Sequence, residues 1–169
     1  MTIFNVRTAK LRPGEQFRDV RSVDLEPLEL GGQRYVPIPE SPEAAITLTQ
    51  TSSGLVLELE LEARMVGPCV RCLADAGETL SIKSREYQAT SPGESDELTT
   101  PYLTDDRLDL SAWARDAIAL ALPDQILHDP DCAGLCPVCG KDLNVEPHTH
   151  ADEMLDPRWS ALEELRDRL

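Results

Sequence analysis

Two groups of cysteines, about sixty residues apart, limit what this chain can fold into more than any other feature. The first group is Cys69-Val70-Arg71-Cys72, and the second extends from Cys132 to Cys136-Pro137-Val138-Cys139-Gly140. All five cysteines of the chain lie in these groups. Two residues between paired cysteines allow one tight turn to direct two thiolates at a tetrahedral ion. Proline and glycine in the second pair favour such a turn. The sequence therefore predicts a metal site where the two groups meet.

The metal that this pattern favours is zinc, in a structural role. The favoured ligand set joins the two turn-presented pairs, Cys69 with Cys72 and Cys136 with Cys139. Four thiolates close a tetrahedral site and leave no position open for a substrate. Such an ion contributes directly to folding where apolar content is low. Cys132 is a fifth candidate ligand because it shortly precedes the second pair.

Two other arrangements distribute the same side chains differently. In one of them a zinc ion is held by the second pair and two histidines that follow it: Cys136, Cys139, His148 and His150. A further, partial site then remains, which His128 would complete: Cys69, Cys72 and Cys132. In the other arrangement, Cys132 replaces one thiolate of the second pair. The sequence alone leaves this choice open.

The excess of acidic over basic residues indicates which kind of molecule the chain can bind. The chain of 169 residues has 31 acidic and 16 basic side chains and a formal net charge of −15. Such a surface repels nucleic-acid phosphates, so a general DNA- or RNA-coating role is disfavoured. A basic protein partner would be attracted to it. The alternative is a small local basic patch around Arg71, Lys83 and Arg85 that contacts RNA.

The N-terminal residues, the apolar segments and the cysteines indicate the cellular compartment of the protein. Residues 1–10 contain no uninterrupted apolar stretch typical of a secretory signal. The apolar stretch Ala117–Leu122 is too short to cross a bilayer. An odd number of cysteines in turn-like pairs suits thiolates in a reducing compartment better than a disulfide framework. We expect a cytoplasmic protein.

Hydrophobic periodicity predicts an α+β fold with a β-rich, antiparallel first half. The first forty residues look extended and irregular, and Pro37 and Pro39 exclude a helix there. Apolar and polar residues then alternate from Ala44 to Glu62, with a turn near Ser52-Ser53-Gly54. This period of two predicts two half-buried strands. A third strand is expected over 79–89, which places the Cys69–Cys72 turn at the tip of a hairpin.

The rest of the chain is expected to be helical and Cys-rich within a single domain over 1–169. A flexible polar loop is predicted over 91–104, after the β-rich part at 1–90. Helical spacing over 108–122 predicts a helix with Ser111 as N-cap, Trp113 in the core and Pro123 beyond its end. A zinc-knuckle-like region follows, and a short amphipathic helix is predicted over 157–169.

The sequence does not favour catalysis. No Gly-rich phosphate loop, nucleophile elbow or H-E-x-x-H motif is present. A redox or metal-relay protein that uses the C-x-x-C pairs is the alternative from another functional class. It has little support, because Cys69 does not open a helix after a strand. We expect a non-enzymatic protein.

The second half of the chain resembles the YceD family, also known as domain of unknown function 177. Four stretches carry the resemblance: Cys69-x-Arg71-Cys72-Leu73; Asp109-Leu110-Ser111 with Leu120-Ala121-Leu122-Pro123; Cys132-x-Gly134-Leu135-Cys136-Pro137-x-Cys139-Gly140 with Leu143-Asn144; and Asp156-Pro157-Arg158-Trp159-x-x-Leu162.

The resemblance implies a cytoplasmic, non-enzymatic factor required for accumulation of 23S ribosomal RNA and hence for large-subunit assembly. Its partner would be a ribosomal protein or the large-subunit rRNA. The family's cysteine positions correspond to Cys69, Cys72, Cys132, Cys136 and Cys139. This sequence departs from many relatives at His148 and His150, where a Cys-x-Cys pair often stands. Histidine also ligates zinc, so the two-site arrangement remains open.

Overall fold

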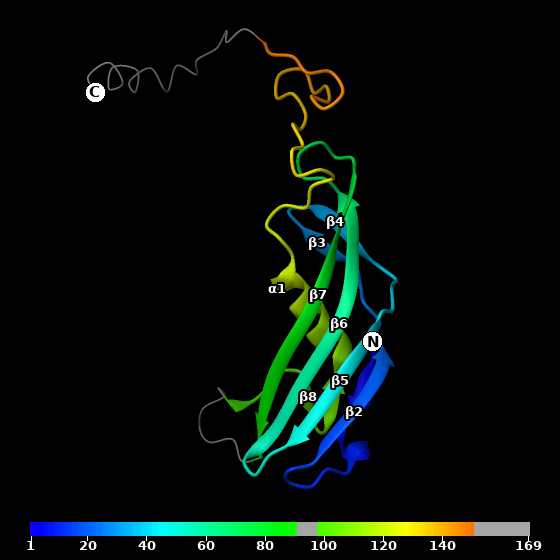
Figure 1. Cartoon of the computed structure of the whole chain (residues 1–169), viewed down its shortest axis with the longest axis vertical. Helices are drawn as coiled ribbons and strands as arrows, with labels where there is room; N and C mark the ends of the chain where they lie inside the picture. The colour runs from blue at the N-terminus through cyan, green and yellow to red at the C-terminus, as the bar shows by residue number, and fades with distance from the viewer. Residues whose placement is uncertain (91–97, 151–169) are drawn as a thin grey trace, which may run out of the picture.

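A long antiparallel hairpin forms the centre of the fold in the computed structural model, which describes residues 1–90 and 98–150. Strand β6 (Gly54–Pro68) pairs with β7 (Asp75–Ala89) along the whole length of both strands. The hairpin runs along the long axis of the molecule, and its tip lies at the end that carries the Cys-rich segment (Figure 1). The hairpin therefore holds Cys69 and Cys72 far from the middle of the sheet.

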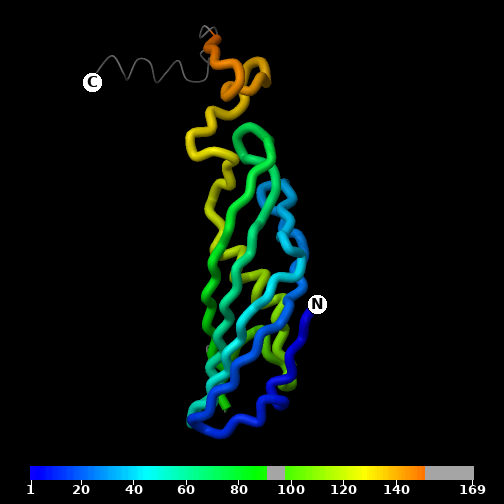
Figure 2. Tube along the Cα trace, turned by 45° about the vertical axis from the view of Figure 1, so that its right-hand side comes forward, coloured from blue at the N-terminus to red at the C-terminus, as the bar shows by residue number. Residues whose placement is uncertain are grey.

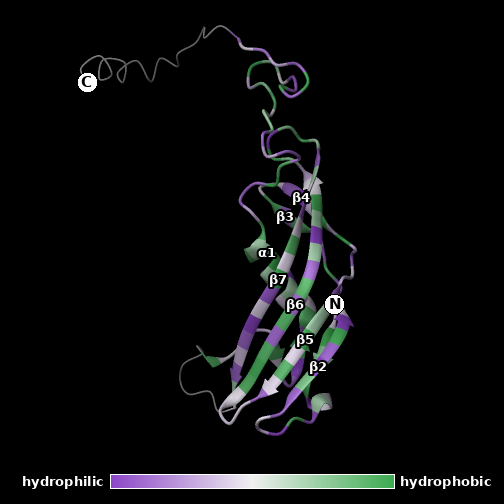
Figure 3. Cartoon of the chain, in the orientation of Figure 1, coloured by the Kyte–Doolittle hydropathy of each residue, from purple (hydrophilic) through white to green (hydrophobic). Residues whose placement is uncertain are grey.

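The alternating sequence pattern explains the hairpin. Leu57, Leu59 and Leu61 are buried on one face of β6, while Glu58 and Glu60 lie on the other. Colouring by hydropathy shows the same alternation as bands along β6 and β7 (Figure 3). Strand β5 (Glu43–Gln50) pairs with β6 through the predicted turn. The three strands predicted after residue 44 are confirmed, with β7 beginning slightly earlier than expected.

The first forty residues are more regular than their sequence suggested. They contain β1 (Ile3–Asn5), a 3-10 turn η1 (Val6–Ala9), β2 (Gln16–Ser22), β3 (Leu28–Leu30) and β4 (Gln33–Ile38). Strand β2 pairs with β5, and β4 pairs with β6 beyond the end of β5, which gives the order β2-β5-β6-β4-β3 with β7 on the other side of β6. The expectation of irregular structure was wrong because β1, β2 and β4 gain partners from segments later in the chain, whereas β3 pairs with its neighbour β4.

A second, three-stranded sheet joins the start of the chain to its middle. Strand β1 pairs with β9 (Arg107–Asp109), and β9 pairs with β8 (Leu103–Thr104). The single helix of the described residues, α1 (Leu110–Ala121), follows β9 directly and lies against β7 (Figure 1). The architecture is antiparallel β-sheet with one helix, which confirms the predicted α+β class.

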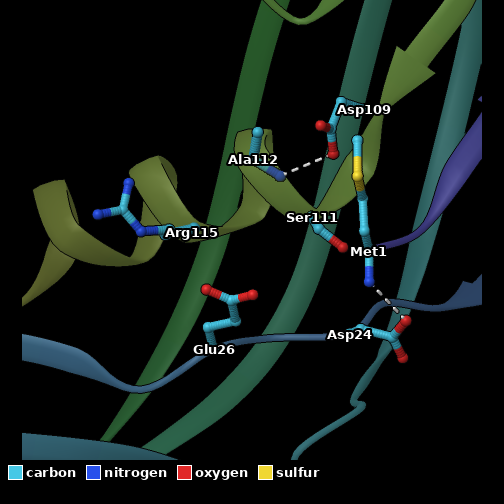
Figure 4. A pocket seen from close by; sticks show the side chains of 7 residues that line it. All are labelled: Met1, Asp24, Glu26, Asp109, Ser111, Ala112 and Arg115. Atoms are coloured by element: carbon cyan, nitrogen blue, oxygen red, sulfur yellow. Dashed lines mark hydrogen bonds and ion pairs between the residues drawn. The ribbon is translucent and has the colours of Figure 1, made fainter.

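The N-cap of α1 differs from the predicted one. Asp109, not Ser111, accepts the hydrogen bond from the Ala112 N–H at 3.0 Å (Figure 4). Ser111 lies in the first turn, where its Oγ accepts a hydrogen bond from the Thr2 N–H at 2.8 Å. Both residue types can cap a helix. The Ser111 hydroxyl is occupied by its contact with Thr2. The sequence around Ser111 does not reveal that contact, because Thr2 is more than one hundred residues away.

Trp113 packs between α1 and β7, which confirms its predicted place in the core. Its side chain is 1% exposed, and its Nε1–H donates to the Ser84 Oγ on β7 at 2.9 Å. Its ring stacks on Tyr102, with ring centroids 6.1 Å apart. Buried apolar area and a satisfied indole donor together favour this position.

Two predicted segments fall partly or wholly outside the described residues. The flexible loop predicted over 91–104 is described only from residue 98, where it leads into β8. The helix predicted over 157–169 lies entirely outside them. Among the helical residues that are described, none forms a segment long and apolar enough to cross a membrane.

Replacing Trp113 should lower the free energy of unfolding far more than replacing an exposed residue of the same helix. Trp113→Ala removes a buried ring and leaves Ser84 without its donor, so we expect a loss of about 3–5 kcal/mol in the free energy of unfolding. Leu120→Ala on the same helix is the control, because Leu120 is 89% exposed. Its change should stay within about 0.5 kcal/mol. Urea unfolding followed by far-UV circular dichroism measures both, and similar losses would contradict this account.

Candidate metal centres

The hairpin tip is a tight turn that presents two thiols. The Cys69 N–H donates to the Ala74 carbonyl at 2.7 Å, and the Leu73 N–H donates to the Cys69 carbonyl at 3.0 Å. Leu73 adopts a left-handed backbone with φ of +64°. These bonds bend residues 69–73 so that Cys69 and Cys72 occupy one cluster.

The Cys136–Cys139 turn repeats this backbone pattern. The Cys136 N–H donates to the Lys141 carbonyl at 2.8 Å, and the Gly140 N–H donates to the Cys136 carbonyl at 2.8 Å. Gly140 takes the left-handed position with φ of +72°, as the sequence pattern predicted. Glycine adopts that conformation without the steric cost that a residue such as Leu73 incurs. The chain thus contains two equivalent C-x-x-C turns, one at each group.

The segment after α1 returns along the hairpin tip and is fastened there. The Val70 N–H donates to the Ile126 carbonyl at 3.1 Å, and the Leu135 N–H donates to the Arg71 carbonyl at 3.1 Å. The Arg71 side chain donates from Nη1 to the Cys132 carbonyl at 3.0 Å. Both views show this returning segment beside the tip (Figures 1 and 2). Residues 126–135 are therefore held against the turn that carries the first cysteine pair.

This attachment assembles the first group of possible metal ligands, which we call the inner cluster. Its members are Cys69, Cys72, His128 and Cys132, whose ligand atoms all lie within 4.8 Å of one another. The Sγ atoms of Cys69 and Cys132 are 3.9 Å apart, and Cys72 Sγ is 3.2 Å from His128 Nδ1. The three cysteines are buried and belong to the hydrophobic core, whereas His128 is exposed.

A second group, the outer cluster, lies beyond it in sequence. Its members are Cys136, Cys139, His148 and His150, again with ligand atoms within 4.8 Å of one another. Cys139 Sγ is 3.1 Å from His148 Nε2, and His148 Nδ1 lies 2.7 Å from the Glu146 carbonyl oxygen. A ring nitrogen fixed by a carbonyl in this way leaves the other nitrogen free for a metal.

The two clusters together contain all five cysteines and all three histidines of the chain. The structure brings each predicted cysteine into a cluster, but it does not join the two C-x-x-C pairs in one. Fastening residues 126–135 to the tip brings Cys132 and His128 to the first pair, while the second pair faces the histidines that follow it. The arrangement matches the two-site alternative. The sequence signalled His128 by its position near cysteines, and His148 and His150 also by the Cys-x-Cys pair that often stands at their positions in the family it resembles.

In each cluster the electrostatic environment favours the thiolate of one cysteine. Burial raises the pKa of Cys69, but hydrogen bonds with His128 and with the backbone of Cys72 outweigh it and lower that pKa to about 5. Hydrogen bonds from the backbone N–H groups of Cys139 and Val138 lower the pKa of Cys136 to about 6, although burial opposes them. For Cys72 the direction is opposite: a hydrogen bond with the Ala74 backbone lowers its pKa, but burial and the neighbouring Cys69 and Cys132 outweigh it and raise that pKa to about 11. The thiolate is the form that binds metal. Each cluster could therefore hold a metal ion.

A cavity beside the first turn of α1 differs from the clusters in the residues that line it. The cavity has a volume of about 220 Å³ and is lined by Met1, Asp24, Glu26, Asp109, Ser111, Ala112 and Arg115 (Figure 4). Two of its carboxylates already have partners, because Asp109 caps α1 and Asp24 pairs with the Met1 amino group at 3.0 Å. Neither a cysteine nor a histidine lines it. The clusters remain the stronger candidates for a functional site.

Comparison with known proteins agrees with the motifs of the site. The family model described as "Large ribosomal RNA subunit accumulation protein YceD" matches residues 57–166, which include both clusters. Uncharacterized proteins of Mycobacterium tuberculosis and Mycobacterium bovis are each 34% identical over 98% of this chain and 81% of their own length. An uncharacterized protein of Mycobacterium leprae is 28% identical over 71% of this chain and 57% of its own length. No solved structure matches.

Gly134 provides a test of the contact between the tip and the returning segment. A Cβ at this position would lie 3.2 Å from the Arg71 carbonyl oxygen, and Gly134 has φ of +78°. Gly32 has nearly the same φ, +77°, but no atom within 4 Å of such a Cβ. Both alanine variants should lose about 1–2 kcal/mol because of the left-handed backbone. We expect Gly134→Ala to lose more, since Arg71 must also move.

The measurement is urea unfolding of the two variants beside the wild type, together with their metal content. Gly134→Ala should also lower the metal content, whereas Gly32→Ala should leave it unchanged. Equal destabilisation and equal metal content would show that the close approach to Arg71 has no energetic role.

Proposed function

This chain belongs to the YceD family of large ribosomal RNA subunit accumulation proteins, and we propose that it supports the accumulation of 23S ribosomal RNA by binding a basic protein of the large ribosomal subunit. The family match carries this proposal. It extends from within β6 through the hairpin tip, α1 and both Cys/His clusters. The segment that the family model describes is therefore the one that builds the candidate metal centres.

The charges of the chain favour a basic protein over RNA as the direct partner. The formal net charge of −15 opposes the approach of phosphates and attracts a cationic protein. Lys83 and Arg85, two members of the basic patch considered from the sequence, pair across the sheet with Glu60 and Glu58. Arg71 donates instead to Cys132 and to Gln125 at the tip.

The spacing along β7 also separates Arg71 from Lys83 and Arg85. Lys83 lies eight residues after Asp75, the first residue of β7. At about 3.3 Å per residue, this distance corresponds to about 26 Å along the strand. Arg71 is at the tip beyond Asp75, so it does not share one surface for RNA with Lys83 and Arg85, which lie two residues apart on β7. This separation supports the protein partner.

Zinc is the metal that we propose for both clusters, because their donors and spacing suit it. Zn–S distances of about 2.3 Å and Zn–N distances of about 2.0 Å place two tetrahedral thiolates about 3.8 Å apart and a thiolate and an imidazole about 3.5 Å apart. The separations of 3.9, 3.2 and 3.1 Å in the clusters are close to these values. The inner cluster would supply three thiolates and one imidazole, and the outer cluster two of each.

Both ions would have structural roles. Four protein ligands complete a tetrahedral zinc site and leave no position for a substrate. The inner ligands would join the hairpin tip to the segment after α1, and thereby fix the shape of this end of the molecule. We propose a cytoplasmic, non-enzymatic factor, because reduced thiols suit a reducing compartment.

Depletion of the protein in the organism that encodes it tests the proposed role. We expect the ratio of 23S to 16S RNA to fall, and expression of the wild-type chain to restore it. Cys132→Ser should fail to restore the ratio, because it removes a ligand of the inner cluster. Leu120→Ala, a change at an exposed position, should restore it. A normal RNA ratio after depletion would reject the proposed function.

Binding measurements distinguish the two kinds of partner. Purified protein is mixed with individual large-subunit ribosomal proteins or with fragments of 23S RNA at increasing salt concentration. We expect binding to a ribosomal protein that weakens with salt, because opposite charges attract across the interface. Lys83→Ala and Arg85→Ala should not weaken it. Salt-sensitive binding to RNA that these two variants abolish would instead identify RNA as the partner.

A further inference from the structure

We infer that the two clusters bind zinc unequally: the inner ion is a permanent part of the fold, whereas the outer ion exchanges and determines whether residues 135–150 remain folded. This inference rests on the proposed zinc binding and assigns a separate role to each site. The two sites differ in the exposure of their ligands, in their attachment to the core, and in what else stabilises the chain around them.

The inner ligands are shielded from solvent. Cys69 is 0% exposed, Cys132 is 2% exposed and Cys72 is 8% exposed. A chelator or a competing ligand in solution could approach only from the side of His128, which is exposed. Three thiolates also provide the softer ligand set, which binds zinc strongly.

The inner ligands are also supported by structure that does not depend on an ion. Cys69 continues directly from β6, and its N–H is bonded to the Ala74 carbonyl. Cys132 is held by the bond from Arg71 to its carbonyl, and its N–H donates to the Asp129 carbonyl at 3.0 Å. All three cysteines pack within the main hydrophobic core. Release of the inner ion would therefore require this end of the core to open.

Most of the outer ligands are open to solvent, and none belongs to the main hydrophobic core. Cys139 and His150 are exposed and His148 is half-buried, so a competing ligand can reach the site directly. All four ligands come from a single stretch of fifteen residues, 136–150. Because neither the sheet nor α1 supplies a ligand, opening this site does not require either element to move.

The outer lobe, residues 135–150, has almost no core of its own. Within this stretch Cys136 alone is buried. The lobe retains backbone hydrogen bonds and an ion pair between Lys141 and Glu146, whose side chains are 57% and 61% exposed. Exposed pairs of this kind contribute little to stability. Apolar burial cannot offset the entropy of ordering such a segment, so metal coordination is the remaining source of stability.

The state of the outer ion would change the surface at this end of the molecule. The lobe lies at the end of the described structure beyond the hairpin tip (Figure 2). Within the lobe, Val138 and Val145 are 71% and 81% exposed. With zinc bound, their positions are fixed relative to the inner cluster through the bond between the Ala133 N–H and Asn144 Oδ1, 2.8 Å long. Without zinc, the lobe loses this fixed arrangement while the sheet keeps its structure.

A stepwise removal of zinc from the full-length protein tests the inference. The protein is loaded with Zn²⁺ under reducing conditions and exposed to increasing concentrations of a chelator, and its zinc content and amide hydrogen exchange are measured in parallel. We expect the content to fall from two ions to one in a first step, with loss of protection confined to residues 135–150. Release of the second ion should coincide with loss of protection at the hairpin tip.

Matched variants assign the steps to the clusters. Cys139→Ser should bind one zinc ion and keep the thermal unfolding temperature of the hairpin, because Cys139 is exposed and outside the core. Cys132→Ser should lower that temperature, and if it fails to fold, His128→Ala replaces it because His128 is an exposed inner ligand. His128→Ala should lose the slow step of zinc release and keep the fast one.

The outcomes separate this inference from the proposed zinc binding. Two ions that leave in one step, or exchange protection lost first at the hairpin tip, would overturn the inference and leave zinc binding intact. A protein that binds a single ion, retained by Cys139→Ser, would likewise overturn it. A protein that binds no zinc and forms a reversible disulfide would reject the zinc proposal itself and support the redox alternative.

Discussion

The contact between Arg71 and the segment that returns from α1 determines how the Cys- and His-rich end of the molecule is arranged. The Arg71 carbonyl accepts from Leu135, and its guanidinium donates to Cys132 and to Gln125. Gly134 lies against the same residue so closely that a side chain there would displace it. These contacts bring Cys132 to Cys69, which lies sixty-three residues earlier in the chain. The partition of the five cysteines and three histidines into two clusters follows from this attachment.

Local patterns in the sequence predicted much of the fold. Alternating leucines gave β5 and β6 correctly, and the C-P-x-C-G run gave the left-handed turn at Gly140. Patterns failed where a distant segment decides the outcome. Strand β1 has only three residues and exists because β9 pairs with it. Ser111 has a suitable side chain for a cap, but its hydroxyl contacts Thr2.

In the candidate site, too, local patterns predicted some features and a distant segment decided the others. The residue types and their spacing indicated which side chains gather, since every cysteine lies in a cluster that could hold a metal ion. Their grouping was not predictable, because both C-x-x-C turns have equivalent backbones and either could have taken the other as its partner. Only the three-dimensional path of residues 126–135 assigns His128 and Cys132 to the first turn. Each cluster contains histidine as well as cysteine, so the number of candidate sites follows from both residue types together.

The pairing of β1 with β9 has a consequence for the order in which the chain can fold as it is synthesised. Phe4 lies opposite Leu108, so the first strand to be made waits for more than one hundred further residues before its partner exists. The β6–β7 hairpin closes over a short turn and can form much sooner. The beginning of the chain is thus among the last parts to reach its place, and the two sheets are completed in the reverse of the order in which their first strands are made.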